Sequence, residues 1–595
     1  MSKVAMVLQG LEPERLAAQI SDRYFEWNSG RAAQRKELEE IRQYIYAVDT
    51  TQTTNKKNPW SHKTHIPKLC QIHDNLGTQY SRAMVGRDDF FTFNPGDQKS
   101  ATKKKRKAIV SYLKTKHKYS KFRQAIKACL QDWVQVGNCF AQLVYVRETV
   151  KDETTGAETT VYEGPKLERI APDDIEFDYK AKSFAEAPKI VRQLVNMGEF
   201  CREVEDRPEL RYDPAAVEKV KKLRATCGQM KPFDQAKIGM DQIAGFTSYP
   251  GYLQSGKVEI LHFYGDIYDD ATGVLWKDAV ISVVDRRFVL RNCKSRDWTN
   301  VGQIYHCGWR KRPDNLWAQG PLNKLVGMQY RIDHLENAKA DGFDQMLCPD
   351  EVYIGNVETI EEGPVRKHFV DDANGDVRYL RPDPQVLQAD FQIERLESQM
   401  EAYAGAPREA MGIRTPGEKT AYEFSELTNA ANELFQNKID DFEDEFIDDI
   451  LNGEVELGTR NLNGADLIEM QDDDFGVLEF KSITTADLRV RGKIVPQGAS
   501  HYKKRQQAVR ELQGFQGTLQ GDPGLAVHFP AKARAVAWND LLDLDQYGLY
   551  QEFGGVAEGV ELQQHQQAAQ QLVEKSSAAA GQQAELEADP EVTNG

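Results

Sequence analysis

The chain has 595 residues and a formal net charge of −16, because 92 Asp and Glu outnumber 76 Lys and Arg. Apolar residues make up 40% and charged residues 28%, which is typical of a globular rather than a disordered chain. This length predicts about three to five structural units. The acidic excess argues against a protein that grips a nucleic-acid duplex with a basic surface.

The eight cysteines are scattered along the chain and form no CxxC pair. They predict reduced, buried thiols in a cytoplasmic setting rather than a disulfide framework. The first residues lack the long apolar core of a secretion signal, so secretion is not expected. No run approaches about 18 uninterrupted apolar residues, so we expect no membrane span.

The first 300 residues mix two hydrophobic periods. Helical spacing predicts helices over 12–46, 62–86 and 105–136, the last with a buried stripe that includes Ile126, Leu130, Trp133 and Val134. Alternating segments predict a hairpin of 140–150 with 159–170, and a second hairpin region over 257–291. A helix is expected between them at 213–225. This half is therefore predicted to be α+β.

The second half has a different order of elements. A helix over 321–346 is expected to end at Pro349, and short strands follow within 350–388. Helical spacing resumes from Ile393 to Tyr403, a Gly- and Pro-rich stretch interrupts it, and a long helix is predicted over 420–451. Strand pieces after 455 precede helices at 500–519 and 532–545. The Gln- and Ala-rich end has too few apolar residues to order its last ~20 positions.

One segment, GIRTPGEKT from Gly412 to Thr420, nearly spells a phosphate-binding loop. Glu418 separates the second glycine from Lys419, however, and Pro416 removes one of the backbone amides that such a loop requires. A flexible loop whose following helix is capped by Thr420, with Glu423 completing a capping box, fits the residues better. We therefore expect no nucleotide site and no cofactor.

Three charged or ligand-like groups also have ordinary interpretations. The acidic run of the long helix, which includes Asp440, Asp441, Glu443 and Asp444, lies opposite apolar residues and predicts a solvated or channel-facing surface rather than a metal nuclease. His62 and His65 lack the neighbouring ligands of a zinc site, so no metal is expected. The basic run from Lys103 to Lys107, continued by Lys114, Lys116, Lys118, Lys121 and Arg123, favours a solvated helix face, or contact with nucleic acid or an acidic partner chain. No motif argues for catalysis.

The order of segments resembles the portal (head–tail connector) proteins of tailed bacteriophages, especially those of short-tailed phages. The resemblance covers most of 58–500, and the last hundred residues carry none. It rests on five segments: NPWSHKTHIPKLCQIHDNLGTQYSRAMVG, LQDWVQVGNCFAQLVYV, VEILHFYGDIYDDATG, GPLNKLVGMQYRIDHLENAKAD, and the long stretch from APREAMGIRTPGEKT to DEFIDDIL at 406–451.

The resemblance implies an α+β portal fold with a wing, a helical stem, a small β-containing clip, a channel loop and a helical crown. The implied boundaries are an N-terminal helical arm at 1–60, wing at 61–315, stem helices at 316–347 and 389–405, clip at 348–388, channel loop at 406–420, long helix and second wing part at 421–495, crown at 496–559, and a C-terminal helix with a disordered tail at 560–595.

The resemblance also implies a function. Such proteins form a ring, usually of twelve copies, at one capsid vertex, through which double-stranded DNA is packaged and ejected. The implied partners are further copies of the chain, the terminase large subunit, the adaptor and tail proteins, the major capsid protein and scaffold, but no membrane. The implied locations are the virion and, during assembly, the host cytoplasm; the ring is also expected to nucleate capsid assembly.

Within this scheme, Arg408, Arg414 and Lys419 are candidates for transient phosphate contacts from the channel loop, and Asp440, Asp441, Glu443 and Asp444 for a channel-facing acidic helix. Energy for packaging would come from a separate terminase ATPase. Two other functions stay open: a packaging ATPase or nuclease with a degraded motif, and a different structural part of the virion such as a tail adaptor or scaffold.

Overall fold

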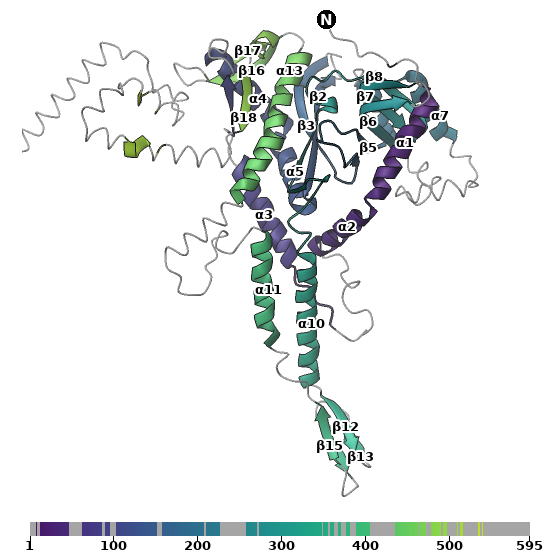
Figure 1. The fold of residues 1–595 in the computed structure, drawn as a ribbon, viewed down its shortest axis with the longest axis vertical. Coiled ribbons are helices and arrows are strands. Elements are labelled where there is room, and N and C mark those ends of the chain that lie inside the picture. The colour runs from purple at the N-terminus through teal and green to yellow at the C-terminus, as the bar shows by residue number, and fades with distance from the viewer. Residues whose placement is uncertain are drawn as a thin grey trace, which may run out of the picture. The chain divides into compact units, whose positions relative to one another are not determined.

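A computed structural model gives the fold (Figure 1). The residues it describes are 8, 12–46, 62–85, 90–95, 103–151, 158–206, 210–226, 257–269, 273–347, 349–354, 357–361, 367–370, 376–380, 388–404, 435–462, 465–471, 478–488, 492–496, and short pieces near 509–515 and 534–538. The chain divides into two compact units, Met1–Glu469 with Phe480–Tyr502, and Met470–Glu479 with Lys503–Gly595. The expected crown and C-terminal tail lie almost wholly outside the described residues.

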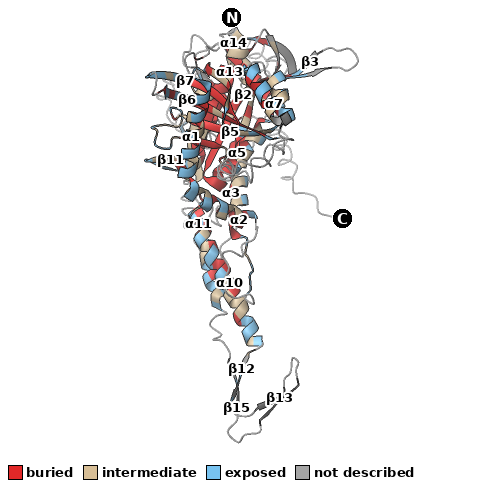
Figure 2. Cartoon of the chain, turned by 90° about the vertical axis from the view of Figure 1, so that its right-hand side faces the viewer, coloured by how far each residue is buried: buried red, intermediate tan, exposed pale blue. Residues whose placement is uncertain are grey.

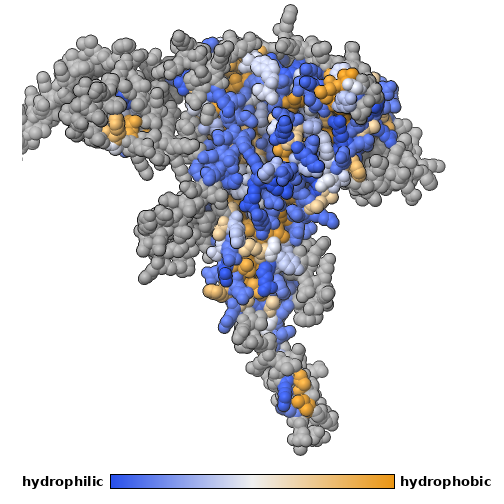
Figure 3. Space-filling model, viewed as in Figure 1, coloured by the Kyte–Doolittle hydropathy of each residue, from blue (hydrophilic) through white to orange (hydrophobic). Residues whose placement is uncertain are grey.

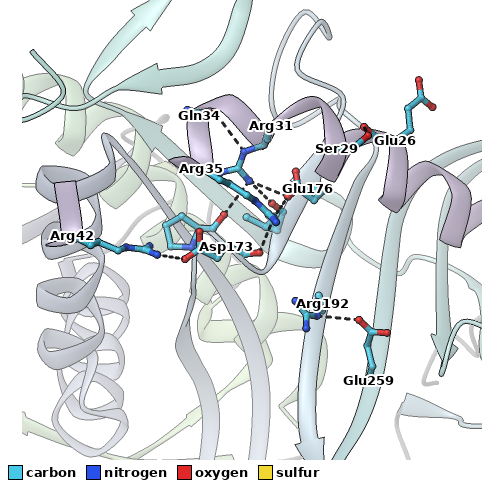
Figure 4. Close-up of polar contacts among 12 residues, drawn as sticks. Glu26, Ser29, Arg31, Gln34, Arg35, Arg42, Asp173, Glu176, Arg192 and Glu259 are labelled. Carbon is cyan, nitrogen blue, oxygen red and sulfur yellow. Dashed lines mark hydrogen bonds and ion pairs between the residues drawn. The ribbon is translucent and has the colours of Figure 1, made fainter. Parts of the chain in front are cut away.

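The predicted helix over 12–46 is two helices, α1 (Pro13–Gly30) and α2 (Ala32–Tyr46). The break is at Arg31, whose side chain is buried and donates hydrogen bonds to the backbone oxygens of Pro172 and Ile175 and to Glu176. Figure 4 shows Arg31 and Arg35 converging on Glu176 from this break. The guanidinium also stacks on Trp317, 3.4 Å from the ring centre. A long-range anchor therefore interrupts a helix that local spacing predicts as continuous.

The expected helix over 105–136 is also two helices, α4 (Lys103–Ser120) and α5 (Phe122–Val136), whereas α3 (Lys68–Val85) is a single helix. Lys121 separates α4 from α5 in the left-handed conformation, at φ 56° and ψ 35°. Ile126, Leu130, Trp133 and Val134 are buried as predicted. Gly137 ends α5 with φ +80°, and a Cβ there would lie 2.2 Å from the backbone nitrogen of Gly320.

Two antiparallel sheets form most of the body. The predicted hairpin is β2 (Asn138–Lys151) with β3 (Glu158–Ile170), extended by β9 (Ile304–Gly308). The second sheet has the order β4 (Ile175–Phe177), β5 (Lys189–Asn196), β6 (Lys257–Asp269), β7 (Val274–Val284) and β8 (Phe288–Lys294). All their pairings are antiparallel.

Helices cover both faces of the five-stranded sheet. Leu261 and Phe263 of β6 pack with α1, whereas Val258 and Ile260 of the same strand pack with α6 (Met197–Asp206) and α7 (Pro214–Thr226). This is the alternation expected of a strand buried on both sides. The largest core joins α2, α3, α5, β2 and the long helix described over 435–461. The chain is therefore α+β, as predicted.

The remaining described elements follow the predicted order. Helix α10 (Val326–Leu347) begins five residues later than predicted, because Leu322 and Leu325 form a separate turn. After it come β12 (Asp350–Ile354), β13 (Val357–Glu361), β14 (Lys367–Val370), β15 (Asp376–Leu380) and α11 (Ala389–Ala404). The long helix is described from 435 and continues past the predicted end, through the π-helical turn η6 (Glu443–Ile447) and α13 (Asp448–Asn461).

Short pairings complete the fold. They are β1 (Phe91–Pro95) with β18 (Gly492–Pro496), β10 (Arg310–Arg312) with β11 (Asn315–Gln319), and β16 (Ala465–Gln471) with β17 (Leu478–Thr484). A 3₁₀ turn, η4 (Val301–Gln303), precedes β9, and the short helix α14 (Thr485–Leu488) lies between β17 and β18. Burial is uneven: Figure 2 shows buried residues concentrated around the two large sheets and few along α10 and α11.

Candidate functional site

The feature that best distinguishes this fold is a helical hairpin with a β insertion. Helices α10 and α11 lie side by side (Figure 1) and run antiparallel, since Lys339, late in α10, pairs with Asp390 at the start of α11 at 2.7 Å. At the other end, Lys68 of α3 bonds Glu401, late in α11, at 2.6 Å. Both side chains of the Lys68–Glu401 pair are almost fully buried, so α3 fixes this end of the hairpin.

The chain between the two helices forms two small antiparallel sheets. Strand β12 pairs with β15, and β13 pairs with β14. These strands lie within 350–388, where short strands are predicted. Each sheet has two strands, and two-stranded sheets are marginally stable alone in water.

An extended segment, 62–67, runs along α10 on a ladder of polar side chains. We call Gln329, Asp333, Asn337 and Asp341 the polar ladder; they are spaced four residues apart and so lie on one face of the helix. Four helical residues rise about 6.0 Å and two extended residues about 6.6 Å. The two repeats therefore match, and alternate residues of the segment meet successive members of the ladder.

The hydrogen bonds follow this match in antiparallel order. The His62 amide donates to Asp341 at 2.8 Å, and the Thr64 amide to Asn337 at 2.7 Å, while Asn337 donates back to the Thr64 oxygen at 3.0 Å. The Ile66 amide donates to Asp333 at 3.0 Å. Gln329 then accepts from the Leu69 amide at 3.1 Å. The ladder thus takes the place of a neighbouring strand for this segment.

Both histidines of the segment bond carboxylates of α10. The His65 Nδ1 lies 2.7 Å from an Asp333 oxygen, and the hydrogen bond to Asp333 raises the pKa of His65. The His62 Nε2 lies 2.6 Å from Asp344, and that hydrogen bond raises the pKa of the exposed His62. Sequence reasoning treated these residues as simple loop histidines, whereas they anchor the segment to the hairpin.

Within the described ranges, no three His, Cys, Asp or Glu side chains are grouped as they would be to hold a metal ion. None of the described helices combines the length and the apolar character required to cross a membrane.

The acidic run of the long helix occupies several environments. Asp444 is exposed, and Asp440 and Asp441 are partly buried and bond neighbours on the same helix, Gln436 and Lys438. Glu443 differs, because its side chain is only 3% exposed and so cannot line a solvated channel in this conformation of the chain. The opposite side is apolar as predicted, with Phe442, Phe446 and Ile450 fully buried.

The other predicted charged groups are only partly described. Arg408, Arg414 and Lys419 lie outside the described residues, as does the channel loop. In the basic run, Lys116 is buried and pairs with Asp466 at 2.5 Å, so this lysine serves the fold.

The polar ladder was missed from sequence. Its four-residue spacing is readable in the sequence, but such a row normally indicates a solvent-exposed helix face.

Comparison with protein families gave no matching family model. The comparison with curated proteins also gave no match.

Proposed function

We propose that this chain is a portal protein of a tailed bacteriophage, an oligomeric ring through which double-stranded DNA enters and leaves the capsid. The observation that carries the proposal is the antiparallel hairpin of α10 and α11 with four short strands between the helices, joined to an α+β body. In the proposed layout these helices are the stem, 348–388 is the clip, and the sheets belong to the wing.

Exposed apolar side chains on the hairpin support an oligomer. Phe343, Leu347 and Phe391 are 50%, 65% and 74% exposed, and Tyr403 is 68% exposed. Figure 3 shows hydrophobic residues on the surface over α10 and α11. Several large exposed apolar side chains along one helical hairpin are typical of a surface that is covered in an assembly.

The net negative charge of the chain also fits a channel for DNA. One chain cannot surround a duplex, so a channel requires a closed ring with head-to-tail contacts. Twelve copies at −16 each would carry about −192 formal charges. A basic wall would release counterions and hold the DNA, whereas an acidic wall leaves it free to slide. Screening over ~8–10 Å limits the repulsion.

The channel loop provides a separate test. We expect Arg408, Arg414 and Lys419 to make transient phosphate contacts, so replacing all three by Ala should change the length of DNA packaged into particles. Unchanged packaging would remove these three residues from the proposal without affecting the ring.

Electron microscopy of the purified chain in negative stain tests the proposed function. The proposal predicts rings with a central hole. Filaments, irregular aggregates or single chains would contradict it, and ATP turnover by the chain alone would favour a packaging enzyme instead.

A further inference from the structure

Helices α4 and α5 carry a concentration of positive charge that is unusual in an acidic chain. Residues 103–131 contain nine Lys and two Arg and no Asp or Glu, although the whole chain has a net charge of −16. A basic segment of this kind is the electrostatic footprint expected of a nucleic-acid-binding surface. It can also be only a solvated helix face, so the positions of its side chains decide what it can bind.

The fold divides these basic side chains into an inner and an outer set. Lys116 and His117 lie on the inner side of α4, where they pair with Asp466 of β16 and Glu454 of α13. Four lysines on either side of the junction between α4 and α5 are exposed instead, and we call them the basic elbow: Lys114, Lys118, Lys121 and Lys127. The two carboxylates therefore meet the inner side of α4 rather than the basic elbow.

The exposed face of α5 carries hydrogen-bond donors that the fold does not use. Gln124, Lys127 and Gln131 are exposed and are spaced three and four residues apart, so they lie on one face of the helix. Within the part of the chain that the structure describes, none of these three side chains makes a hydrogen bond or an ion pair. Lys and Gln side chains both donate hydrogen bonds to phosphate oxygens. This face therefore offers a row of donors to an anionic partner.

The backbone at the junction of the two helices is one that glycine adopts more easily than lysine. Lys121 has φ 56° and ψ 35°, in the left-handed region. Its exposed side chain makes no hydrogen bond or ion pair with any described residue, so the fold gives no reason for a lysine at this position. A side chain kept in a costly backbone conformation points to a function outside the fold.

We propose that the basic elbow and the exposed face of α5 bind the phosphate backbone of duplex DNA. Seven helical residues, as from Lys114 to Lys121, rise about 10 Å, and a duplex carries about six charges over that length. Each lysine of the elbow can therefore meet its own phosphate. An acidic protein fits less well, because protein interfaces have an apolar centre and α5 carries none of the large apolar side chains that are exposed among the described residues.

This inference rests on the proposed function for the identity of the polyanion, because the proposed channel brings duplex DNA to this chain. The surface itself is separate from the channel loop and from the hairpin of α10 and α11, since it belongs to two helices of the body. About four phosphate contacts give weak binding that depends strongly on salt and not on base sequence.

The test is fluorescence anisotropy of the full chain with a labelled duplex of about 12 base pairs, between about 50 and 200 mM salt. Each neutralised phosphate contributes about −0.9 to the slope of log K against log salt, so four contacts predict a slope of about −3.6 and a loss of about 150-fold over this range. The double variant Lys121→Gln, Lys127→Gln should show about half that slope and lose only about 12-fold. The matched control is Lys219→Gln, Lys221→Gln, which removes the same charge from two exposed lysines of α7 and should keep the wild-type slope.

A second variant separates the charge of the elbow from its structure. Lys121→Gly removes the charge at a backbone conformation that glycine adopts without strain, so hydrogen exchange of α4 and α5 should be unchanged or slower. The salt slope should nevertheless become shallower by about 0.9. Weaker DNA binding that appears only together with faster exchange of both helices would make Lys121 structural and overturn the inference.

The outcomes separate this inference from the proposed function, because mass photometry of the same samples reports the ring. A wild type that forms rings but does not bind the duplex, or a double variant with the wild-type slope, overturns the DNA surface and leaves the ring. A double variant that keeps the slope but no longer forms rings assigns the elbow to a protein contact and also overturns the inference. A monomeric wild type that binds DNA with the expected slope supports the surface and contradicts the proposed function.

Discussion

The polar ladder makes Asp333 the residue on which the attachment of the 62–67 segment most depends. Its carboxylate is 7% exposed and accepts from three donors: His65 Nδ1 at 2.7 Å, the Ile66 amide at 3.0 Å and Gln329 at 2.9 Å. In Asp333→Ala, Gln329 keeps its bond to the Ile66 oxygen, but two donors lose their acceptor. A buried donor left unpaired costs about 1–3 kcal/mol, and partial hydration reduces the sum, so we expect local opening to become easier by about 2–4 kcal/mol.

Hydrogen exchange followed by mass spectrometry is the appropriate assay, because a chain of this size is not expected to unfold in one step. Each 1.4 kcal/mol is a factor of ten, so amides of the peptide spanning 62–69 should exchange about 30- to 700-fold faster in Asp333→Ala. Asp344→Asn is the matched control: Asp344 also bonds a histidine, but its side chain is 62% exposed, so exchange should barely change. Unchanged exchange in Asp333→Ala would refute the ladder as the anchor.

Three further predictions concern the body and the hairpin. The hydrogen bond with Asp333 raises the pKa of His65 above 6.5, so the bond's contribution to stability should be complete below that pH and lost as pH rises through the folded-state pKa. Protection of the amides of 62–66 against hydrogen exchange, corrected for intrinsic exchange, should therefore fall at alkaline pH in the wild type. It should not fall in this way in His65→Gln. In the same hydrogen-exchange assay, Gly137→Ala should make local opening at the end of α5 easier by about 2–4 kcal/mol, because φ is +80° and the Cβ meets Gly320. Gly77→Ala, which has open space in α3, should leave exchange of its helix unchanged or slower. Equal effects of the two substitutions would contradict this. Cys139 and Cys307 are fully buried, and burial raises the pKa of the Cys307 thiol to about 12. A maleimide should therefore label the partly exposed Cys70 in the native protein. It should react with Cys139 and Cys307 only after denaturation.

Sequence reasoning worked where local periodicity and burial agree. The β2–β3 hairpin, the apolar stripe of α5 and the order of helix, short strands and helix from α10 to α11 all follow from residues whose spacing matches their element. The breaks at Arg31 and Lys121 could not be predicted in this way. Arg31 interrupts a helix because residues about 140 positions away bind its side chain, and no local signal encodes such partners.

The charged helices show the same limit of prediction from local sequence. Carboxylates of the long helix were predicted as one acidic surface, yet Glu443 is buried and Asp448, also buried, bonds Lys493 of β18. A one-dimensional charge run does not reveal which members meet a neighbouring strand. The polar ladder was hidden for the opposite reason, because polar residues on a helix indicate solvent unless the segment that covers them is known.

The central claim is that many copies of this chain close into a ring. Mass photometry of the purified protein tests it most directly, since one chain has a mass of 67.5 kDa. The account predicts a dominant, discrete species near the mass of twelve chains, about 810 kDa. A protein that stays at 67.5 kDa at every concentration tested would contradict it.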